Sequence, residues 1–402
     1  MSDHLPVVLI ETRGDVPAGH FGSTLVALLQ CDPDGVQCVV PNGLDARYLR
    51  QGISNDQLHK PTVWTARLFH RIGVTARFCA RRSLVSPLAR RSHTARSFMH
   101  AAVRMSYALD EAAGLREALH IAPGSVAVVM TAEPRLGRFV EAISRVGHLR
   151  YLHEADEQPN LFVERFALLS ARLPRTRTGC RVLVPHPALI AAAACSESVP
   201  VVGYAPFAVA PSMDALRRGT RTIRGDGRQA SPIRVLLIGR LWAHKQCERT
   251  LDGVRAAFPD GAEVIALAGL SRLREEAMAR GVPLVTLDAD CLTEEELDRQ
   301  IVDADVIVVE RQRGVRRESG SVIRCLGAPT PVVLISDDPF LHAEFRAVQG
   351  VYPIAPDSDH ELAAALIAAV TSPTAHEERR PFRYRAAARL ESFRRSKQEY
   401  EL

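Results

Sequence analysis

The chain has 402 residues and a mass of 44.1 kDa, which is too long for one ordinary domain and long enough to bury two hydrophobic cores. Its hydrophobic content of 47%, charged content of 24% and net charge of +5 are those of a globular protein and do not call for a nucleic-acid partner. No apolar run approaches the roughly 18 residues that cross a bilayer, and no signal-like segment opens the chain. We therefore expect a two-domain cytoplasmic protein.

The first half of the chain alternates strand and helix patterns, which predicts a parallel, doubly wound sheet. The expected strands are Pro6–Glu11, Val36–Val40, Ser125–Thr131, Leu149–Ala155, Cys180–His186 and Val199–Val209. The expected helices are Ser23–Leu29, Leu136–Val146 and Pro187–Ala194. The turn between the first strand and the first helix is rich in glycine, at Gly14, Gly19 and Gly22. It is either a plain connecting loop or a loop that lets the backbone approach a ligand closely.

A strongly basic stretch interrupts this alternation. No acidic residue occurs from Gln57 to Leu109, whereas arginines accumulate among Trp64, Phe69, Phe78 and Phe98. The pattern predicts an insertion or an extended loop-helix region with a positive face. Three interpretations remain open for residues 67–104: a solvated face, a surface for anionic lipid headgroups or a polyanionic acceptor, and a nucleic-acid surface. No nucleic-acid-binding signature accompanies the charge, so we expect no nucleic acid.

A polar, glycine-containing linker, residues 211–232, separates an N-terminal domain, residues 1–210, from a second domain, residues 233–380. The second domain again alternates. Its expected strands are Ile233–Arg240, Glu263–Gly269, Pro283–Asp288, Asp305–Glu310, Pro331–Ser336 and Val351–Ala355. Its expected helices are Leu270–Arg280, Thr293–Asp303, a short one through Val322 and Leu326, Phe340–Ala347 and Glu361–Val370. Residues 381–402 carry a last, arginine-rich helical pattern, Phe382–Tyr400.

Eight cysteines are scattered along the chain without a Cys-x-x-Cys pair, and several lie in apolar strand patterns. We expect reduced, buried thiols rather than disulfides or metal ligands. Neither half has a Gly-x-Gly-x-x-Gly motif after its first strand, which argues against a nicotinamide dehydrogenase. No metal or other cofactor is expected.

Two motifs in the second domain contain candidate functional residues. The strand Ile233–Arg240 ends in Gly-Arg, and Lys245 follows five residues after Arg240. Fixed cations at a strand end suit a diphosphate leaving group, which gains negative charge as it departs. In the stretch from Ala304 to Asp337, the residues Glu318-Ser-Gly-Ser321 precede the short helix, so free backbone N–H groups are expected to face an anion.

These motifs resemble the donor site of family 4 retaining glycosyltransferases of the GT-B fold. The matching features are Ala304-Asp305, the Glu before a Ser-Gly-Ser turn, Arg324 in the next helix, Thr330-Pro331 and Asp337. The resemblance implies an α/β protein with two doubly wound Rossmann-like domains that face an interdomain cleft. It also implies a C-terminal helix that returns to the N-terminal domain.

The resemblance further implies a hexosyltransferase-like enzyme that transfers a sugar from a nucleotide diphosphate sugar, of UDP or GDP type, to a hydroxyl of a glycan, lipid or small molecule. Glu318 and His153 would be catalytic residues near the sugar. The donor would bind Arg240, Lys245, Ser319, Gly320, Ser321 and Arg324. The acceptor side of the cleft would include Gly19, Gly22, Ser23 and Glu154.

The sequence departs from the family pattern at one position that bears on activity. Eight residues after Glu318, where the family carries a second Glu, stands Leu326. With the alignment anchored on Ser-Gly-Ser, the first Glu position falls on Arg317 as readily as on Glu318. A non-catalytic binding or scaffold subunit and another GT-B sugar-nucleotide enzyme, such as an epimerase, therefore remain alternatives.

Overall fold

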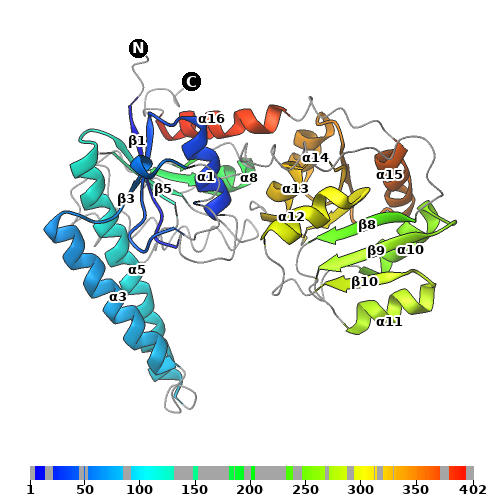
Figure 1. Cartoon of the computed structure of the whole chain (residues 1–402), viewed down its shortest axis with the longest axis horizontal. Helices are drawn as coiled ribbons and strands as arrows, with labels where there is room; N and C mark the ends of the chain where they lie inside the picture. Colours follow the sequence, from blue (N-terminus) through cyan, green and yellow to red (C-terminus); the bar gives the residue numbers. More distant parts are fainter. Residues whose placement is uncertain are drawn as a thin grey trace. The chain divides into compact units, whose positions relative to one another are not determined.

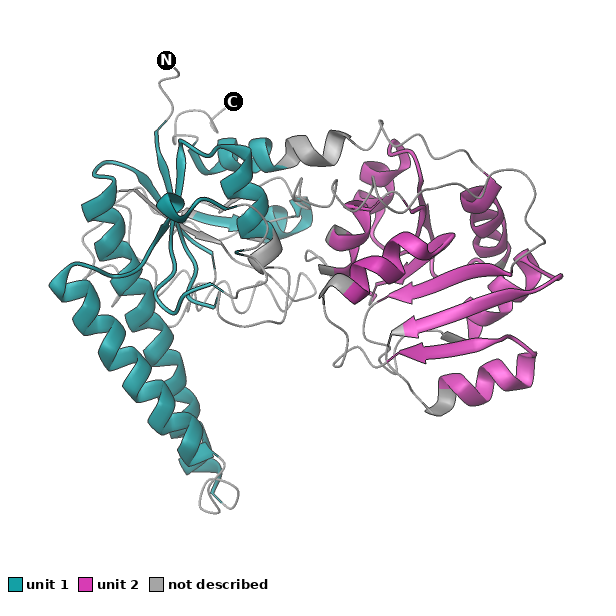
Figure 2. Cartoon of the chain, in the orientation of Figure 1, with its two compact units in different colours: residues 1–208, 385–402 teal, residues 209–384 magenta. Residues whose placement is uncertain are grey.

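The computed structural model describes residues 5–13, 21–44, 49, 53–84, 92–130, 148–152, 181–184, 186–193, 201–203, 232–238, 247–267, 271–287, 294–311, 313–314, 320–328, 330–371 and 380–394. The chain divides into two compact units, shown in Figure 2. Unit 1 comprises residues 1–208 and 385–402, and unit 2 comprises residues 209–384.

Unit 1 is built on a parallel sheet of seven strands in the order β3-β2-β1-β4-β5-β6-β7 (Figure 1). The strands are β1 Val7–Ile10, β2 Val36–Val39, β3 Leu58–His59, β4 Val126–Val129, β5 His148–Leu152, β6 Arg181–Val184 and β7 Val201–Gly203. All four residues of β1 and all four of β4 are buried, because a parallel sheet covered by helices hides both of its faces. The strands predicted from apolar runs in this half are confirmed.

The helices of unit 1 are α1 Phe21–Cys31, α3 Trp64–Leu84, α5 His93–Ile121 and α8 Pro187–Ala193, with a 3₁₀ turn η1 at Asn55–Gln57. The second half of α5 packs on the sheet, where Ala108, Ala112 and Leu115 join the core around Val8 and Ile10. Gly114 permits this close approach, since a Cβ at that position would lie 2.4 Å from Cγ2 of Ile10. The predicted helix Leu136–Val146 lies outside the described residues.

The basic stretch, predicted as an insertion or an extended loop-helix region, contains two long helices. In Figure 1, α3 and α5 lie side by side and run away from the sheet. They are antiparallel, because His70 contacts Asp110 whereas Gly73, later in α3, approaches Ser106, earlier in α5. Ser92 caps the start of α5 by accepting a hydrogen bond from the amide of Ala95 at 3.2 Å.

Unit 2 is built on a parallel sheet of six strands in the order β10-β9-β8-β11-β12-β13. The strands are β8 Ile233–Ile238, β9 Ala262–Leu267, β10 Leu284–Leu287, β11 Val306–Glu310, β12 Val332–Ile335 and β13 Val351–Ile354. The helices are α10 Cys247–Ala257, α11 Ser271–Arg280, α12 Glu294–Asp303, α13 Gly320–Leu326, α14 Pro339–Arg346 and α15 Asp359–Thr371. The expected elements are confirmed, and α10 is one that the sequence analysis missed.

The last helix, α16 Arg380–Arg394, passes from unit 2 into unit 1 along the chain. Its C-terminal residue Arg394 donates from Nε to the carbonyl of Leu5 at 3.1 Å and pairs with Asp32. Leu390 and Phe393 are buried in the same part of the helix. The end of α16 is thereby attached to residues that lie next to β1 and α1 in the chain.

Four cysteines in the described part of the chain are free: Cys31, Cys38, Cys79 and Cys325. Cys38 and Cys325 are buried as expected, but Cys79 is exposed on α3, so the expectation of buried thiols is wrong at that position. The reason is its place on the outward side of a helix whose other side packs on α5. Within the described ranges, no helix has both the length and the apolar character that crossing a membrane demands.

Candidate functional site

In the sheet of unit 2, the order in which the chain adds strands reverses at the centre, between β8 and β11. β8 pairs in parallel with β9 on one side and with β11 on the other. From this pair the chain adds β9 and β10 in one direction and β12 and β13 in the other. Open parallel sheets bind ligands outside the carboxyl ends of the two strands at such a switch point. Ile238 and Val309 are register partners, so both strands end at the same level.

The segments that follow these two strands contain most of the predicted donor residues. Residues 239–246, between β8 and α10, include Arg240 and Lys245. Residues 311–319, between β11 and α13, include Glu318 and Ser319. These four residues lie outside the described ranges, but the strands and helices on either side of them are described. Both segments therefore leave adjacent strands at the same edge of the sheet.

The helix α13 contains the other predicted donor residues. Gly320 is its first residue and Ser321 its second, whereas Arg324 lies in its last turn. Arg324 donates from Nε to Oδ1 of Asp298 on α12 at 2.6 Å, and both side chains are largely buried. This ion pair attaches α13 to α12. At least one N–H group of Arg324 thus has a structural partner.

Hydrogen bonds join the strand ends along this edge of the sheet. Gly314, after β11, donates its amide to Asp337, after β12, at 2.9 Å. Arg313 pairs with Asp357, which follows β13. The buried carboxylate of Asp338 caps α14 by accepting a hydrogen bond from the amide of Phe340 at 3.1 Å. The loops at the edge are therefore held to one another by side chains rather than left as independent segments.

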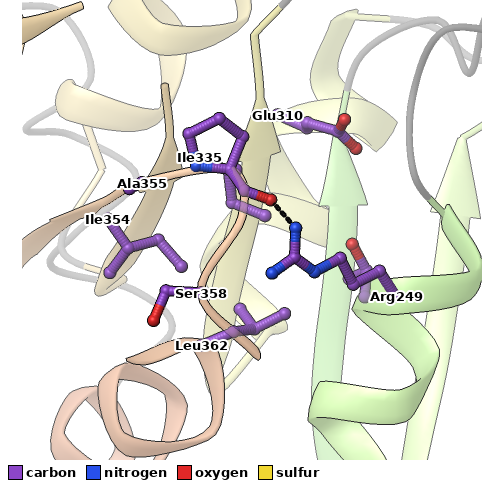
Figure 3. A pocket seen from close by; sticks show the side chains of 9 residues that line it. Arg249, Glu310, Ile335, Ile354, Ala355, Ser358 and Leu362 are labelled. Atoms are coloured by element: carbon purple, nitrogen blue, oxygen red, sulfur yellow. Dashed lines mark hydrogen bonds between the residues drawn. The ribbon is translucent and has the colours of Figure 1, made fainter. Parts of the chain in front are cut away.

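A small cavity lies at the same edge, between β11, β12, β13, α10 and α15 (Figure 3). Arg249 of α10 lies over it and donates to the carbonyl of Pro356, and the carboxylate of Glu310 lies nearby. The cavity's volume of about 10 Å³ is enough for about one water molecule. It is far too small for a nucleotide sugar, so it is not the donor site.

In unit 1, only two of the predicted site residues lie within the described part of the chain. Gly22 and Ser23 lie in the first turn of α1, which follows β1. Gly19, His153 and Glu154 lie outside the described residues, although His153 directly follows the end of β5 at Leu152. β1 is the switch strand of this sheet, since it pairs with both β2 and β4. The segment after β1, which contains Gly19, thus begins at the switch point of unit 1.

The structure also shows a polar cluster at the carboxyl ends of β1 and β2 that the sequence analysis missed. Asp110 of α5, which is fully buried, accepts hydrogen bonds from Nδ2 of Asn42 at 3.0 Å and from Arg77 at 2.8 Å. His70 Nδ1 lies 2.9 Å from the other oxygen of Asp110. Asn42 also donates to the carbonyl of Thr12 at 2.7 Å, just past β1.

An aromatic ring completes this cluster. The guanidinium carbons of Arg13 and Arg77 lie 4.9 Å and 4.7 Å from the centre of the Tyr107 ring, a cation–π arrangement. In the sequence, Asp110 stands out only as the acidic residue that ends the acid-free stretch, and nothing there indicates its partners. The cluster fixes α3 and α5 to the carboxyl edge of the sheet. It also places the guanidinium groups of Arg13 and Arg77 at the part of this edge beside β1 and β2.

The described residues contain no group of three or more His, Cys, Asp or Glu side chains arranged to hold a metal ion. In both units, then, the features that suit a ligand occur at the carboxyl edge of a parallel sheet.

No protein-family model matches the chain, and a comparison with curated proteins finds no relative. Solved structures do match. An α,α-trehalose-phosphate synthase (UDP-forming) from Burkholderia vietnamiensis aligns over 97% of both chains at 14% identity, with a TM-score of 0.52. A glycosyltransferase from Rickettsia africae aligns over 97% of this chain and 96% of its own at 8% identity, with a TM-score of 0.51.

A third match is the Anabaena protein Alr3699/HepE in complex with UDP-glucose. It covers 97% of both chains at 13% identity, with a TM-score of 0.50. Identities this low show likeness of fold alone. Together with the two doubly wound parallel sheets, these structural matches show that this chain has the GT-B fold.

Proposed function

We propose that the protein is a glycosyltransferase that moves a sugar from a nucleotide diphosphate sugar to an acceptor hydroxyl. One observation carries the proposal: the segments with Arg240, Lys245, Glu318 and Ser319 leave two adjacent parallel strands, β8 and β11, at the switch point of the unit 2 sheet. Ligands of such sheets bind there. Cations, a carboxylate and small residues that free backbone amides are the groups that a sugar diphosphate needs.

In the proposed reaction, Arg240 and Lys245 stabilise the negative charge that develops on the departing diphosphate. Ser319, Gly320 and Ser321 offer backbone donors to the phosphates, and Glu318 holds sugar or ribose hydroxyls. His153 contacts the transferred sugar, and Gly19, Gly22, Ser23 and Glu154 line the acceptor side. Arg324, which also pairs with Asp298, contacts the donor from the last turn of α13.

Retention of configuration and independence from metal are further parts of the proposal. Two fixed cations on the diphosphate supply the charge that a divalent ion supplies in other transferases. UDP is the first nucleotide to test because the HepE structure contains UDP-glucose, and GDP is the second. Free thiols on described residues are consistent with the cytoplasmic location that we propose. We propose that the protein contacts the membrane surface peripherally through its basic region.

The direct test is turnover. Lys245→Ala should reduce kcat by about 10²–10³-fold, the usual cost of removing one group that stabilises transition-state charge. Lys60→Ala is the matched control, because Lys60 is an exposed lysine of unit 1. Normal turnover in Lys245→Ala would contradict the diphosphate role. Activity that persists in EDTA would support metal independence, whereas activity that EDTA abolishes and Mg²⁺ restores would contradict it.

A non-catalytic sugar-nucleotide binder is the second candidate. The observation that favours it is Leu326, which replaces the family's second Glu and is only 2% exposed at the end of α13. This position therefore contributes to the core of unit 2. A protein that binds one nucleotide sugar tightly, yet neither transfers nor hydrolyses the sugar with any acceptor tested, would support this alternative over the transferase.

A further inference from the structure

The helices α3 and α5 together form an arm, which we define as residues 64–84 and 93–109. Its inner end, with Trp64 and Leu68, lies beside the part of α5 that packs on the sheet, and the rest of the arm projects beyond the sheet. Gly114 of α5 lies beside Ile10, the last residue of β1, and Asp110 lies beside Asn42, which follows β2. The helix pair therefore extends past the carboxyl edge of the sheet. Residues 93–109 amount to about 25 Å of helix at 1.5 Å per residue. This part of α5 has α3 as its neighbour and lies beyond the sheet.

The arm exposes large apolar side chains along one side of α3. Trp64 is 68% exposed and Phe78 is 64% exposed, with Leu68 and Ile72 also exposed. Trp64, Leu68 and Ile72 recur every fourth residue, and Phe78 follows Trp64 by nearly four helical turns, so they share one face. The opposite face, which packs on α5, contains the buried small residues Ala66, Gly73 and Ala80. The apolar face is therefore not the contact between the two helices.

The second helix of the arm, α5, also exposes large apolar side chains. Phe98 is 68% exposed on α5, and Met105, seven residues later on the same face, is also exposed. Scattered single apolar residues on a surface are ordinary, but a row of exposed aromatic and branched side chains along one face of a helix marks an interaction surface. Something other than water is expected to cover these residues.

The charge of the arm identifies the partner. The arm contains no Asp or Glu, and exposed arginines lie beside the apolar residues: Arg67, Arg71, Arg81, Arg82 and Arg96. A helix with Trp, Phe and Leu on one face and arginines around them is the pattern of elements that lie in the headgroup region of anionic membranes. Each arginine near such a surface contributes about 1 kcal/mol of attraction.

The same features disfavour other partners. Two copies of the arm would bring arginines against arginines, which opposes self-association. A nucleic-acid backbone would satisfy the charge but would leave the apolar row of α3 in water. We propose that the arm is a membrane-docking element that inserts Trp64, Phe78 and Phe98 at the surface of a bilayer containing anionic lipid.

This inference rests on the peripheral membrane contact proposed above and names the residues that make it. It is independent of the transferase activity, because vesicle binding requires neither donor nor acceptor. The chain contains two tryptophans, Trp64 and Trp242. In the full-length Trp242→Phe protein, Trp64 is the sole tryptophan and reports on the arm. We expect its emission to shift to shorter wavelength, and to be quenched by brominated lipid, when phosphatidylcholine vesicles containing phosphatidylglycerol are added. No such change is expected with phosphatidylcholine alone.

Two pairs of substitutions separate the contributions of charge and apolar area in vesicle flotation. Arg71→Ala with Arg82→Ala should weaken binding about 25-fold, from roughly fivefold for each arginine. Phe78→Ser with Phe98→Ser should also weaken binding while leaving the melting temperature unchanged, since both rings are mostly exposed. Arg255→Ala with Arg299→Ala, two exposed arginines of unit 2, is the matched control and should bind vesicles normally.

Several results would overturn the proposal. Equal binding to neutral and anionic vesicles would remove the role of the arginines, and unchanged binding of the Phe78/Phe98 variant would remove the role of the apolar row. Tighter binding to single-stranded RNA than to anionic vesicles would assign the arm to nucleic acid. A concentration-dependent dimer that the Phe78/Phe98 variant loses would assign it to self-association.

Discussion

The carboxylate of Asp110 lies 2.8 Å from the guanidinium of Arg77, and both side chains are removed from solvent, with Asp110 fully buried. One residue belongs to α5 and the other to α3, and Asn42 at the edge of the sheet hydrogen-bonds to both. A single ion pair therefore joins the two helices of the arm to each other and to the strand β2. Its removal should loosen the arm at its base.

We predict that Asp110→Ala lowers the free energy of unfolding by about 3–5 kcal/mol, because it leaves the guanidinium of Arg77 buried without its carboxylate. Urea unfolding followed by circular dichroism measures the change. Arg82→Ala is the control, since Arg82 is an exposed arginine of the same helix and should change stability by less than about 0.5 kcal/mol. Equal stabilities of the two variants would contradict a structural role for Asp110.

A second prediction concerns Glu117 of α5, whose carboxylate caps the start of α3. Its buried carboxylate accepts hydrogen bonds from the amide of Thr62 at 2.8 Å and from the amide of Val63 at 3.1 Å, and also from the hydroxyl of Thr62. Glu117→Ala should cost about 2–4 kcal/mol of stability, because these donors lose a charged acceptor. Glu117→Gln keeps one acceptor oxygen and should cost less. If thermal melting finds the two variants alike, the carboxylate is not capping the helix.

A third prediction tests the packing of the arm. A Cβ at Gly73 would lie 2.8 Å from the backbone carbonyl oxygen of Ser106 on α5, which is closer than atoms can approach. Intrinsic helix propensity alone would make Gly73→Ala stabilising by about 1 kcal/mol. We expect the clash to dominate, so the variant should melt at a lower temperature than the wild type. A higher melting temperature would show that α3 and α5 are not packed as closely as described.

Cysteine reactivity provides a fourth prediction. Burial, reinforced by the nearby carboxylate of Glu11, raises the pKa of the Cys38 thiol well above its usual range. A raised pKa lowers the fraction of reactive thiolate at neutral pH, and raising the pH through the ordinary thiol range should not activate Cys38 in the folded protein. Cys79 is exposed on α3 and should be alkylated first. Peptide mapping after brief iodoacetamide treatment distinguishes the two, and early labelling of Cys38 would refute the assignment.

The strands were predictable because each is a short apolar, β-branched run flanked by polar or glycine-containing turns. β11 and β12, for example, consist of Val306–Glu310 and Val332–Ile335 and appear close to their expected bounds. The alternation of such runs with helices also predicts their parallel pairing. Such runs can be recognised in the sequence because a strand that is buried on both faces of a parallel sheet is apolar along its length.

The polar cluster and the role of Arg324 were not predictable in the same way. Asp110 and Asn42 are 68 residues apart, and their contact depends on where α5 crosses the edge of the sheet. The sequence likewise assigns Arg324 to the donor, whereas its ion pair with Asp298 depends on the packing of α13 on α12. Side-chain partners that come from separate elements have no signature in a local pattern, so only the folded structure reveals them.

The central claim is that unit 2 binds a nucleotide diphosphate through Lys245. The most direct measurement is the melting temperature of the purified protein with UDP, GDP, ADP and TDP and their sugars, compared for the wild type, Lys245→Ala and Lys60→Ala. A ligand at 100 times its Kd stabilises a protein by about 2.7 kcal/mol, or roughly 5–10 °C for a domain of this size. We predict such a shift with one nucleotide family in the wild type and in Lys60→Ala, and its loss in Lys245→Ala. No shift with any nucleotide, or an equal shift in Lys245→Ala, would contradict the account.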